Sequence, residues 1–372
     1  MPPITLHLHK SFFRSQPMEI IRAAGCSAEL FIYDTGIEAV RLINQRGHLI
    51  VLPYYGQIIW QAFFDGVDLT MESHFRAPRP ASDIVGTYGC FMFHSGLLRN
   101  GNPGAEDTHA LHGEMPVAPM DSARIETGID DQGPWLALVS EREYLMGFGD
   151  HYRAQPRVTL RPDSALFEIG MEVENLSQNP MELMYMCHAN FAYVEGGALL
   201  QPTSFSAVDT VIRTSVPGLV KADDAYLQRL ESLKRDPRHT AVVSAALQPD
   251  PELVFSLKNL RPVADGRVHM LLQRPAGDAF MVQYHPQEFS HLIRWILANP
   301  MQKVCAFAMP ATCGVEGYHR EKNAGNVRTL AGGERAQFTV KLGYLTAEES
   351  PAEAARIRAA YAASPLHETK DV

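Results

Sequence analysis

The most constraining feature of this sequence is the alternation of apolar with polar or small residues over residues 167–174, FEIGMEVE. A period of two residues places one side of a strand in a core and the other side toward water. The apolar run at 157–160 precedes it across the turn-forming sequence RPDS at 161–164, so the two runs are predicted to pair as a hairpin. Residues 337–344 alternate in the same way and predict another half-buried strand.

The N-terminal part of the chain shows a second group of strand signals. Four short apolar runs lie between residues 29 and 69, and turn sequences separate them at 34–36, 46–47 and 55–56. Apolar runs of this length between tight turns are typical of antiparallel strands. We therefore expect a meander of strands in this region.

Helical signals are few. Residues 350–353, SPAE, form a capping-box pattern with proline at the first helical position, which predicts a helix over about 351–363. Residues 222–235 carry an apolar stripe and end before Pro237, which predicts an insertion helix. No repeat or flexible linker divides the chain. We expect an all-β protein, a single large β-sandwich domain over 1–372 with its core at about 28–346 and a few peripheral short helices.

Composition excludes several functional classes. The formal net charge of −9, without a cluster of Lys and Arg, argues against nucleic-acid binding. No apolar run reads as a signal peptide or approaches the roughly 20 residues of a membrane span. The five cysteines are odd in number, widely spaced and free of any CxxC pair, so neither a disulfide framework nor a cysteine zinc site is indicated. We expect a cytoplasmic protein.

Three segments carry residues suited to acid–base chemistry. Residues 106–114, EDTHALHGE, contain two histidines among carboxylates, and the glycine after His112 would allow a ligand to approach the backbone. His188 follows an apolar run in CHANFAY, and Glu316 stands at a turn in GVEGY. Taken singly, these residues also fit a polar surface loop, a core histidine and a solvent-facing strand residue.

The order and spacing of these motifs resemble a divergent branch of the aldose 1-epimerase superfamily over about residues 30–345. The motifs are YGCFMFHSGLLRNGNP at 88–103, HALHG at 109–113, CHANFAY at 187–193, GVEGYHREKNAG at 314–325 and LAGGERAQFTVKLGY at 330–344. The resemblance implies a galactose mutarotase-like β-supersandwich with an open cleft. It also implies an isomerase of carbohydrate metabolism that interconverts the anomers of a small-molecule sugar, without a metal or redox cofactor.

The resemblance also implies roles for individual residues. Glu316 would remove the proton of the anomeric hydroxyl, His188 would donate a proton to the ring oxygen, and His112 would hold the sugar. A neighbouring carboxylate is expected to keep histidine protonated. The expected substrate-binding residues are Arg76, His94, Arg99, Glu114, Asn190 and Arg320. The family's sugar-gripping aspartate has no clear counterpart. Four aromatic side chains could face the sugar or fill the core, namely Trp60, Tyr88, Phe191 and Trp295.

Two alternatives remain open from the sequence. A metal-dependent sugar isomerase or lyase could use His109, His112, Glu114 and His188 as ligands, since imidazole and carboxylate suit zinc or manganese. A non-catalytic sugar-binding protein could use the same scaffold, because fold does not determine function. The chain could also form a homodimer.

Overall fold

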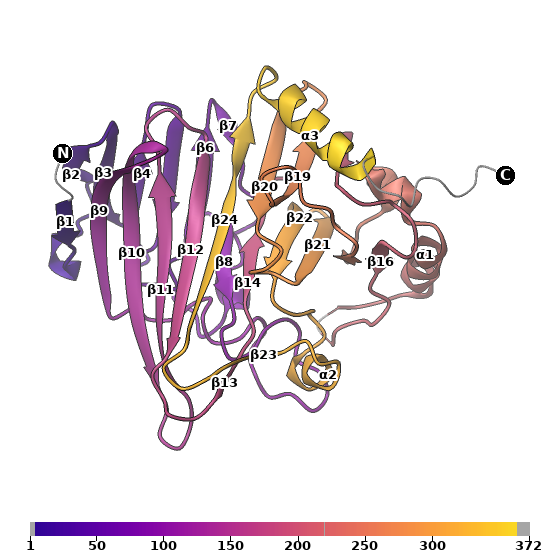
Figure 1. The fold of residues 1–372 in the computed structure, drawn as a ribbon, viewed down its shortest axis with the longest axis horizontal. Coiled ribbons are helices and arrows are strands. Elements are labelled where there is room, and N and C mark those ends of the chain that lie inside the picture. Colours follow the sequence, from indigo (N-terminus) through magenta and orange to yellow (C-terminus); the bar gives the residue numbers. More distant parts are fainter. Residues whose placement is uncertain (1–3, 219, 363–372) are drawn as a thin grey trace.

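The computed structural model describes residues 4–218 and 220–362, and two large antiparallel sheets dominate it (Figure 1). Sheet A contains, in spatial order, β1 (Ile4–His7), β9 (Ser122–Asp130), β10 (Gly133–Leu145), β11 (His151–Leu160), β12 (Leu166–Asn175), β24 (Arg335–Leu345), β20 (Ala279–Tyr284), β19 (Val268–Gln273), β15 (Gly197–Leu200) and β17 (Val242–Val243).

Sheet B contains, in spatial order, β16 (Thr210–Ile212), β18 (Leu253–Leu257), β21 (His291–Ala298), β22 (Lys303–Ala311), β14 (Met186–Ala189), β8 (Met92–Ser95), β6 (Ile59–Phe64), β5 (Gly47–Val51), β4 (Glu38–Ile43), β3 (Cys26–Ile32) and β2 (Met18–Ala23). A short strand, β7 (Val67–Asp68), pairs with β6, and β13 (Met181–Leu183) pairs with β23 (Arg328–Leu330) outside both sheets. The main hydrophobic core draws residues from both sheets, so their inner faces pack against each other.

The strands confirm the alternation in the sequence. Every second residue of β12 is buried, and β12 pairs with β11 on one side and β24 on the other, with Ile169 opposite both Val158 and Val340. The predicted meander is formed by β3, β4, β5 and β6, which are neighbours in sheet B. The period-two pattern therefore identified strands in both sheets.

The α-helices of the described residues lie at the periphery: α1 (Asp224–Arg235), α2 (Tyr318–Asn323) and α3 (Ser350–Ala362). The 3₁₀ turns are Lys10–Phe12, Ile84–Thr87, Pro237–Ala241 and Ala245–Leu247. Both predicted helices are confirmed, although residue 363, the predicted end of the last one, lies outside the described residues. In the described ranges, none of the helices combines the length and apolar character needed to cross a membrane. All five cysteines are buried free thiols.

The predicted capping box at the start of α3 is wrong. The Ser350 hydroxyl is buried without a hydrogen-bond partner among the described residues. The Glu353 carboxylate instead contacts the buried His269 ring and the Arg356 guanidinium. Tertiary pairing with β19 has replaced the local cap, which attaches α3 to sheet A.

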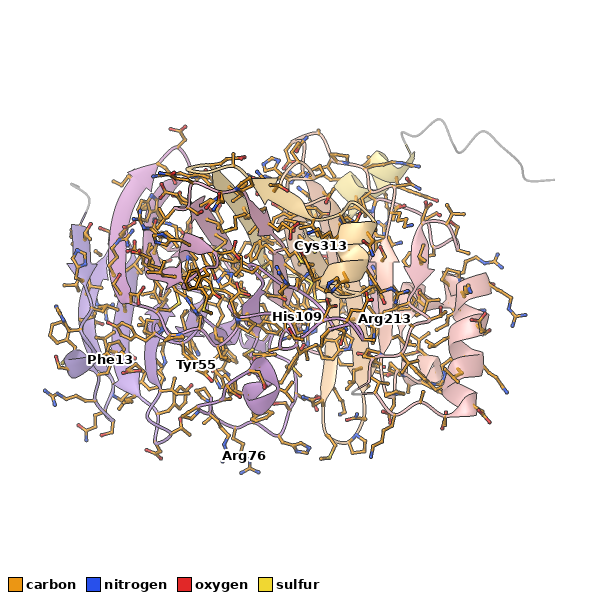
Figure 2. The ribbon with its side chains drawn as sticks, turned by 90° about the horizontal axis from the view of Figure 1, so that it is seen from below. Phe13, Tyr55, Arg76, His109, Arg213 and Cys313 are labelled. Carbon is orange, nitrogen blue, oxygen red and sulfur yellow. The ribbon has the colours of Figure 1, made fainter. Side chains whose placement is uncertain are left out.

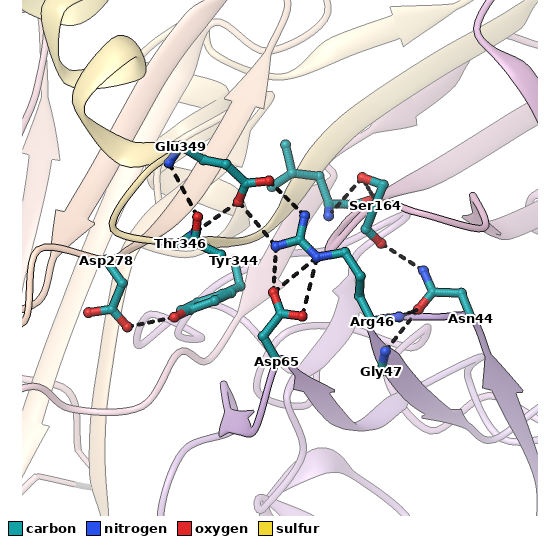
Figure 3. Close-up of polar contacts among 10 residues, drawn as sticks. Asn44, Arg46, Gly47, Asp65, Ser164, Asp278, Tyr344, Thr346 and Glu349 are labelled. Atoms are coloured by element: carbon teal, nitrogen blue, oxygen red, sulfur yellow. Dashed lines mark hydrogen bonds and ion pairs between the residues drawn. The ribbon is translucent and has the colours of Figure 1, made fainter.

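A polar network joins the two sheets where the β4–β5 turn meets the C-terminal segment (Figure 3). The Arg46 guanidinium binds the carboxylates of Asp65 and Glu349 together. Asn44 Nδ2 donates to the carbonyl oxygens of Arg161 and Ser164, both at 2.7 Å, across to sheet A. Asn44 Oδ1 accepts from the backbone N–H groups of Arg46 and Gly47, and the side chain thus uses all its hydrogen-bonding groups.

Asn44→Ala is expected to lower the free energy of unfolding by about 2–4 kcal/mol, because two carbonyls and two N–H groups in a partly buried turn lose their partner. Denaturant unfolding would measure the change. Arg22→Ala is the control, since it removes only the exposed Arg22–Glu19 pair, worth roughly 1 kcal/mol or less. Equal losses in the two variants would contradict the role assigned to Asn44.

Candidate active site

A cavity of about 230 Å³ lies on the face of sheet B that points away from sheet A. Alternation along β14 creates this arrangement, because Cys187 and Ala189 point into the main core while Met186 and His188 line the cavity. The other lining residues are Phe75, Val85, Tyr88, Asn102, Leu111, His112, Arg213, Glu252, Val254, Ile293, Trp295, Gln302, Met309 and Val315.

The two predicted histidines meet in this cavity. His188 comes from β14 and His112 from the long connection between β8 and β9, and their ring centroids lie 4.8 Å apart, with the rings nearly perpendicular. Phe93 of β8 stacks on His188 at 4.3 Å between centroids and contacts His112 at 5.3 Å. His188 is only 3% exposed and His112 only 7% exposed. The pair is therefore held rigidly at one side of the cavity.

Hydrogen bonds orient the His112 ring. The Ser95 hydroxyl donates to Asn100 Oδ1 at 2.5 Å, and His112 Nδ1 lies 3.1 Å from the same hydroxyl oxygen. A hydroxyl has one proton, so the Ser95 oxygen accepts the proton of His112 Nδ1–H. In this arrangement the neutral His112 ring keeps the lone pair of Nε2 free.

The glycine after His112 lies at a close approach between two backbone segments. His112 and Gly113 both have positive φ, 64° and 81°. A Cβ atom on Gly113 would lie 2.0 Å from the carbonyl oxygen of Arg99. The chain's own backbone thus occupies the position of a side chain at Gly113, and glycine is required there because any side chain would collide.

His188 Nε2 lies 3.2 Å from the Tyr88 hydroxyl, which also faces the cavity. The other ring nitrogen of His188, Nδ1, is buried, and so is Asn190 Oδ1. Neither atom has a hydrogen-bond partner among the described residues. Asn190 Nδ2 donates to the carbonyl oxygen of Cys90. Asn190 therefore lies behind His188 and does not line the cavity.

Burial reverses the predicted protonation of the histidines. It lowers the pKa of His188 to about 3, although the Asn190 side chain opposes the shift. It also lowers the pKa of His112 well below the usual value, and the charges of His188, His109 and Arg213 add to this effect. Both rings are thus neutral near pH 7, because transfer of a charged imidazole from water into the protein is costly.

The carboxylates of the site gather around Arg213, which follows β16. The Arg213 guanidinium donates to Glu252 Oε1, and Trp295 Nε1 donates to Glu252 Oε2 at 2.9 Å. Burial raises the pKa of Glu252, while the charge of Arg213 opposes the rise. The Trp295 ring also lies 5.9 Å from the His188 ring, between centroids. The Trp295 indole thus contacts both the Glu252 carboxylate and the His188 ring.

Glu316 lies at the edge of this group. Its Oε2 accepts hydrogen bonds from Ser215 at 2.6 Å and Arg320 at 3.2 Å. Its Oε1 lies 3.9 Å from Arg213 Nε and accepts no hydrogen bond from the described residues. The preceding residue, Val315, lines the cavity, whereas the Glu316 side chain is 30% exposed and does not. Arg213 therefore links Glu316 to the cavity.

A second cavity, of about 570 Å³, receives two of the predicted substrate-binding residues. Arg99 lies there with its guanidinium 3.7 Å from the Tyr318 ring centroid. Glu114 also lines it and accepts hydrogen bonds from Leu97 and Leu98 N–H and from the Tyr152 hydroxyl. The carboxylate of Glu114 therefore orders the chain around the cis peptide Gly96–Leu97.

His94 and Arg76 do not contribute to the first cavity. His94 is fully buried on the opposite face of β8, where Nδ1 contacts the Tyr185 hydroxyl at 2.9 Å. Arg76 is exposed and lies at the edge of the molecule, far from Arg213 in the view of Figure 2. Arg320 touches the site only through Glu316. The sequence alone could not distinguish these orientations.

The ligand set of the metal-dependent alternative is divided between the two cavities. His112 and His188 line the first, and His109 and Glu114 line the second. Within the part of the chain that the structure describes, no three or more His, Cys, Asp or Glu side chains are grouped to hold a metal ion. The geometry gives this alternative no support.

Arg213 and Glu252 were missed from the sequence. Glu252 immediately precedes the apolar run of β18, just as Glu316 follows the run of β22, so a carboxylate next to a strand end was a usable signal. Of the four aromatic candidates, Tyr88 and Trp295 line the cavity. Trp60 and Phe191 are core residues.

The fold resembles several solved structures. A putative aldose 1-epimerase from Klebsiella pneumoniae matches with a TM-score of 0.77 and 14% identity, over 97% of this chain and 96% of that one. A galactose mutarotase-like protein from Clostridium acetobutylicum matches with a TM-score of 0.54 and 12% identity, over 89% and 98% of the two chains. The predicted all-β supersandwich and the resemblance to the aldose 1-epimerase superfamily are confirmed as a likeness of fold.

Sequence comparisons place the chain more specifically. A search of curated proteins found no match. The family model described as a domain of unknown function, DUF4432, matches residues 34–344, which is most of the chain. The protein therefore belongs to the DUF4432 family, with a fold similar to that of galactose mutarotase-like proteins.

Proposed function

We propose that this protein interconverts the α and β anomers of a free sugar by general acid–base catalysis. The observation that carries the proposal is one cavity lined by two buried imidazoles, Arg213 and the Glu252 carboxylate, with Glu316 attached at its edge through Arg213. Mutarotation needs proton removal from the anomeric hydroxyl and proton delivery to the ring oxygen. The likeness to proteins described as aldose 1-epimerases supports the same activity.

Glu316 is the proposed base. Both oxygens of Glu252 are engaged by Arg213 and Trp295, which makes this side chain suited to holding sugar hydroxyls in place. Within residues 4–218 and 220–362, Glu316 Oε1 has only the ion-pair contact with Arg213 at 3.9 Å, so its lone pairs remain available. A carboxylate at the cavity edge can accept a proton and exchange it with solvent between turnovers.

His188 and the Tyr88 hydroxyl form the proposed proton-donating pair, because they share a hydrogen bond at the cavity surface. Glu316 takes the proton from the anomeric oxygen, the bond between C1 and the ring oxygen breaks, and the ring oxygen takes the proton of the Tyr88 hydroxyl. The resulting tyrosinate accepts a hydrogen bond from His188 Nε2–H. Rotation about C1–C2 and reversal of the two transfers give the other anomer. His112 holds the sugar through its free Nε2. This sequence of steps requires neither a metal nor a redox cofactor.

Saturation-transfer NMR on a panel of free aldoses would test the activity. The protein is expected to increase the exchange between α and β signals above the buffer rate for at least one sugar. Glu172→Gln changes an exposed carboxylate partner on sheet A and is expected to leave the rate unchanged. Binding without accelerated exchange would instead indicate the non-catalytic sugar-binding alternative.

The pH dependence of kcat/KM should show no break near pH 6.5 from the cavity histidines. An ordinary histidine titrates near 6.5, but the pKa of His188 is lowered to about 3 and that of His112 is also lowered. His188 therefore remains neutral between pH 5 and pH 8, and the proposed proton-donating pair does not change its charge in this interval. Initial-rate polarimetry across the interval would measure the profile. A break near pH 6.5 would show that an imidazolium takes part.

A further inference from the structure

One wall of the first cavity consists of hydrocarbon and thioether groups. The wall is formed by Met186, Val254, Ile293, Met309 and Val315, which come from β14, β18, β21, β22 and the turn after β22. These side chains belong to one apolar cluster and are each at most 8% exposed. We call them the apolar wall. Its members offer no strong hydrogen-bonding group to a ligand.

The polar groups of the cavity lie outside this wall, and several of them are already committed to other contacts. Arg213 and Trp295 bind Glu252, the Tyr88 hydroxyl contacts His188, and Gln302 Nε2 donates to the Tyr88 carbonyl oxygen. A sugar hydroxyl pressed against the apolar wall would lose its water without gaining a partner, which is unfavourable. The wall therefore selects against a hydroxyl at the position it covers.

This inference rests on the proposed function, which determines the part of the sugar that would contact the apolar wall. The ring oxygen is placed at His188, and the C5 substituent of an aldopyranose is attached next to that oxygen. Met186 shares a strand face with His188. On the neighbouring strand β22, Ala311 pairs with Met186. Met309, two residues earlier on β22, pairs with Ile293 of β21. The C5 substituent would thus meet Met186, Met309 and Ile293.

From this geometry we infer that the substrate is a 6-deoxyhexose, a sugar with a methyl group at C5 in place of the hydroxymethyl group of an ordinary hexose. The methyl group would pack on the apolar wall, while the remaining hydroxyls face the polar groups of the cavity. A hydrophobic pocket discriminates against an added hydroxyl by up to about 10²-fold. The expected preference in kcat/KM is therefore 10- to 100-fold.

Pairs of sugars that differ only at C6 test this inference: L-fucose with L-galactose, L-rhamnose with L-mannose, and D-fucose with D-galactose. Saturation-transfer NMR would give the exchange rate for each member. Faster exchange of the deoxy sugar within at least one pair, by 10-fold or more, supports the inference. Equal or faster exchange of the hexoses overturns it while the proposed function stands. Absence of accelerated exchange for every sugar overturns both.

A variant pair locates the preference in the wall. Ile293→Thr places a hydroxyl in the wall and is expected to reduce the deoxy-to-hexose ratio of kcat/KM at least 5-fold, toward unity. Val304→Thr places a hydroxyl in the same apolar cluster without lining the cavity and should preserve the ratio. Because a ratio is measured, a general loss of folded protein cancels. An unchanged ratio in Ile293→Thr would contradict the assigned wall.

Discussion

Glu316→Gln is expected to lower kcat for anomer exchange by about 10²–10⁴-fold, the usual contribution of a positioned general base. The amide keeps nearly the same shape and can still accept a hydrogen bond from Ser215, but it cannot take up a proton at neutral pH. KM should change much less than kcat, because the side chain lies at the edge of the cavity. Exchange rates measured against sugar concentration would separate the two constants.

Glu252→Gln is the matched comparison on the other side of Arg213. Its oxygens are held by Arg213 and Trp295, so the substitution weakens the organisation of the sugar-binding groups and is expected to act mainly on KM. The opposite pattern, with kcat lost in Glu252→Gln and retained in Glu316→Gln, would assign the base to Glu252. Thermal unfolding of both variants would verify that each is folded.

Acidification from pH 7.5 to pH 5 is expected to lower the free energy of unfolding by about 4 kcal/mol through two buried histidines alone. Burial lowers the pKa of both His94 and His188 to about 3 in the folded protein, against about 6.5 in the unfolded chain. Below pH 6.5 the unfolded chain therefore binds protons that the folded protein excludes. Stability is fully present above pH 6.5 and declines as the pH falls toward 3.

Denaturant unfolding at several pH values would measure this decline, which amounts to about 1.4 kcal/mol per pH unit for each histidine below pH 6. His94→Gln should remove one of the two contributions and flatten the slope, whatever its effect at pH 7.5. His151→Gln is the control, because His151 is paired with Glu143 near the surface. A slope that is the same in His94→Gln and in the unchanged protein would rule out a buried neutral His94.

Local pattern was sufficient to predict most of the framework. The alternation in residues 167–174 predicted β12, and the runs between 29 and 69 predicted the meander of β3 to β6. A strand with one buried face must repeat every two residues, so its signature is contained in a short stretch of sequence. The capping box before α3 failed because Glu353 found a stronger partner, His269, which is distant in the chain.

Local pattern was insufficient to assign the site in full. It identified His112 and His188, which share a cavity, but it placed His94 there as well, although His94 points from the other face of β8 into the core. Arg99 belongs to the motif that precedes His112 in the chain, and Glu114 follows His112 by two residues. Both side chains nevertheless line a different cavity. Neither Arg213 nor Glu252 stood out, since each acquires its role only by meeting the other.

The sequence by itself determined the fold class, the strand-forming segments and the identity of the two cavity histidines, because strand periodicity and motif order are properties of short stretches of chain. The tertiary structure alone decided the protonation of those histidines, the pairing of Glu252 with Arg213 and the apolar wall beside them. The physical reason is that desolvation, ion pairing and shape depend on neighbours brought in from remote parts of the chain. No local pattern records which neighbours those are.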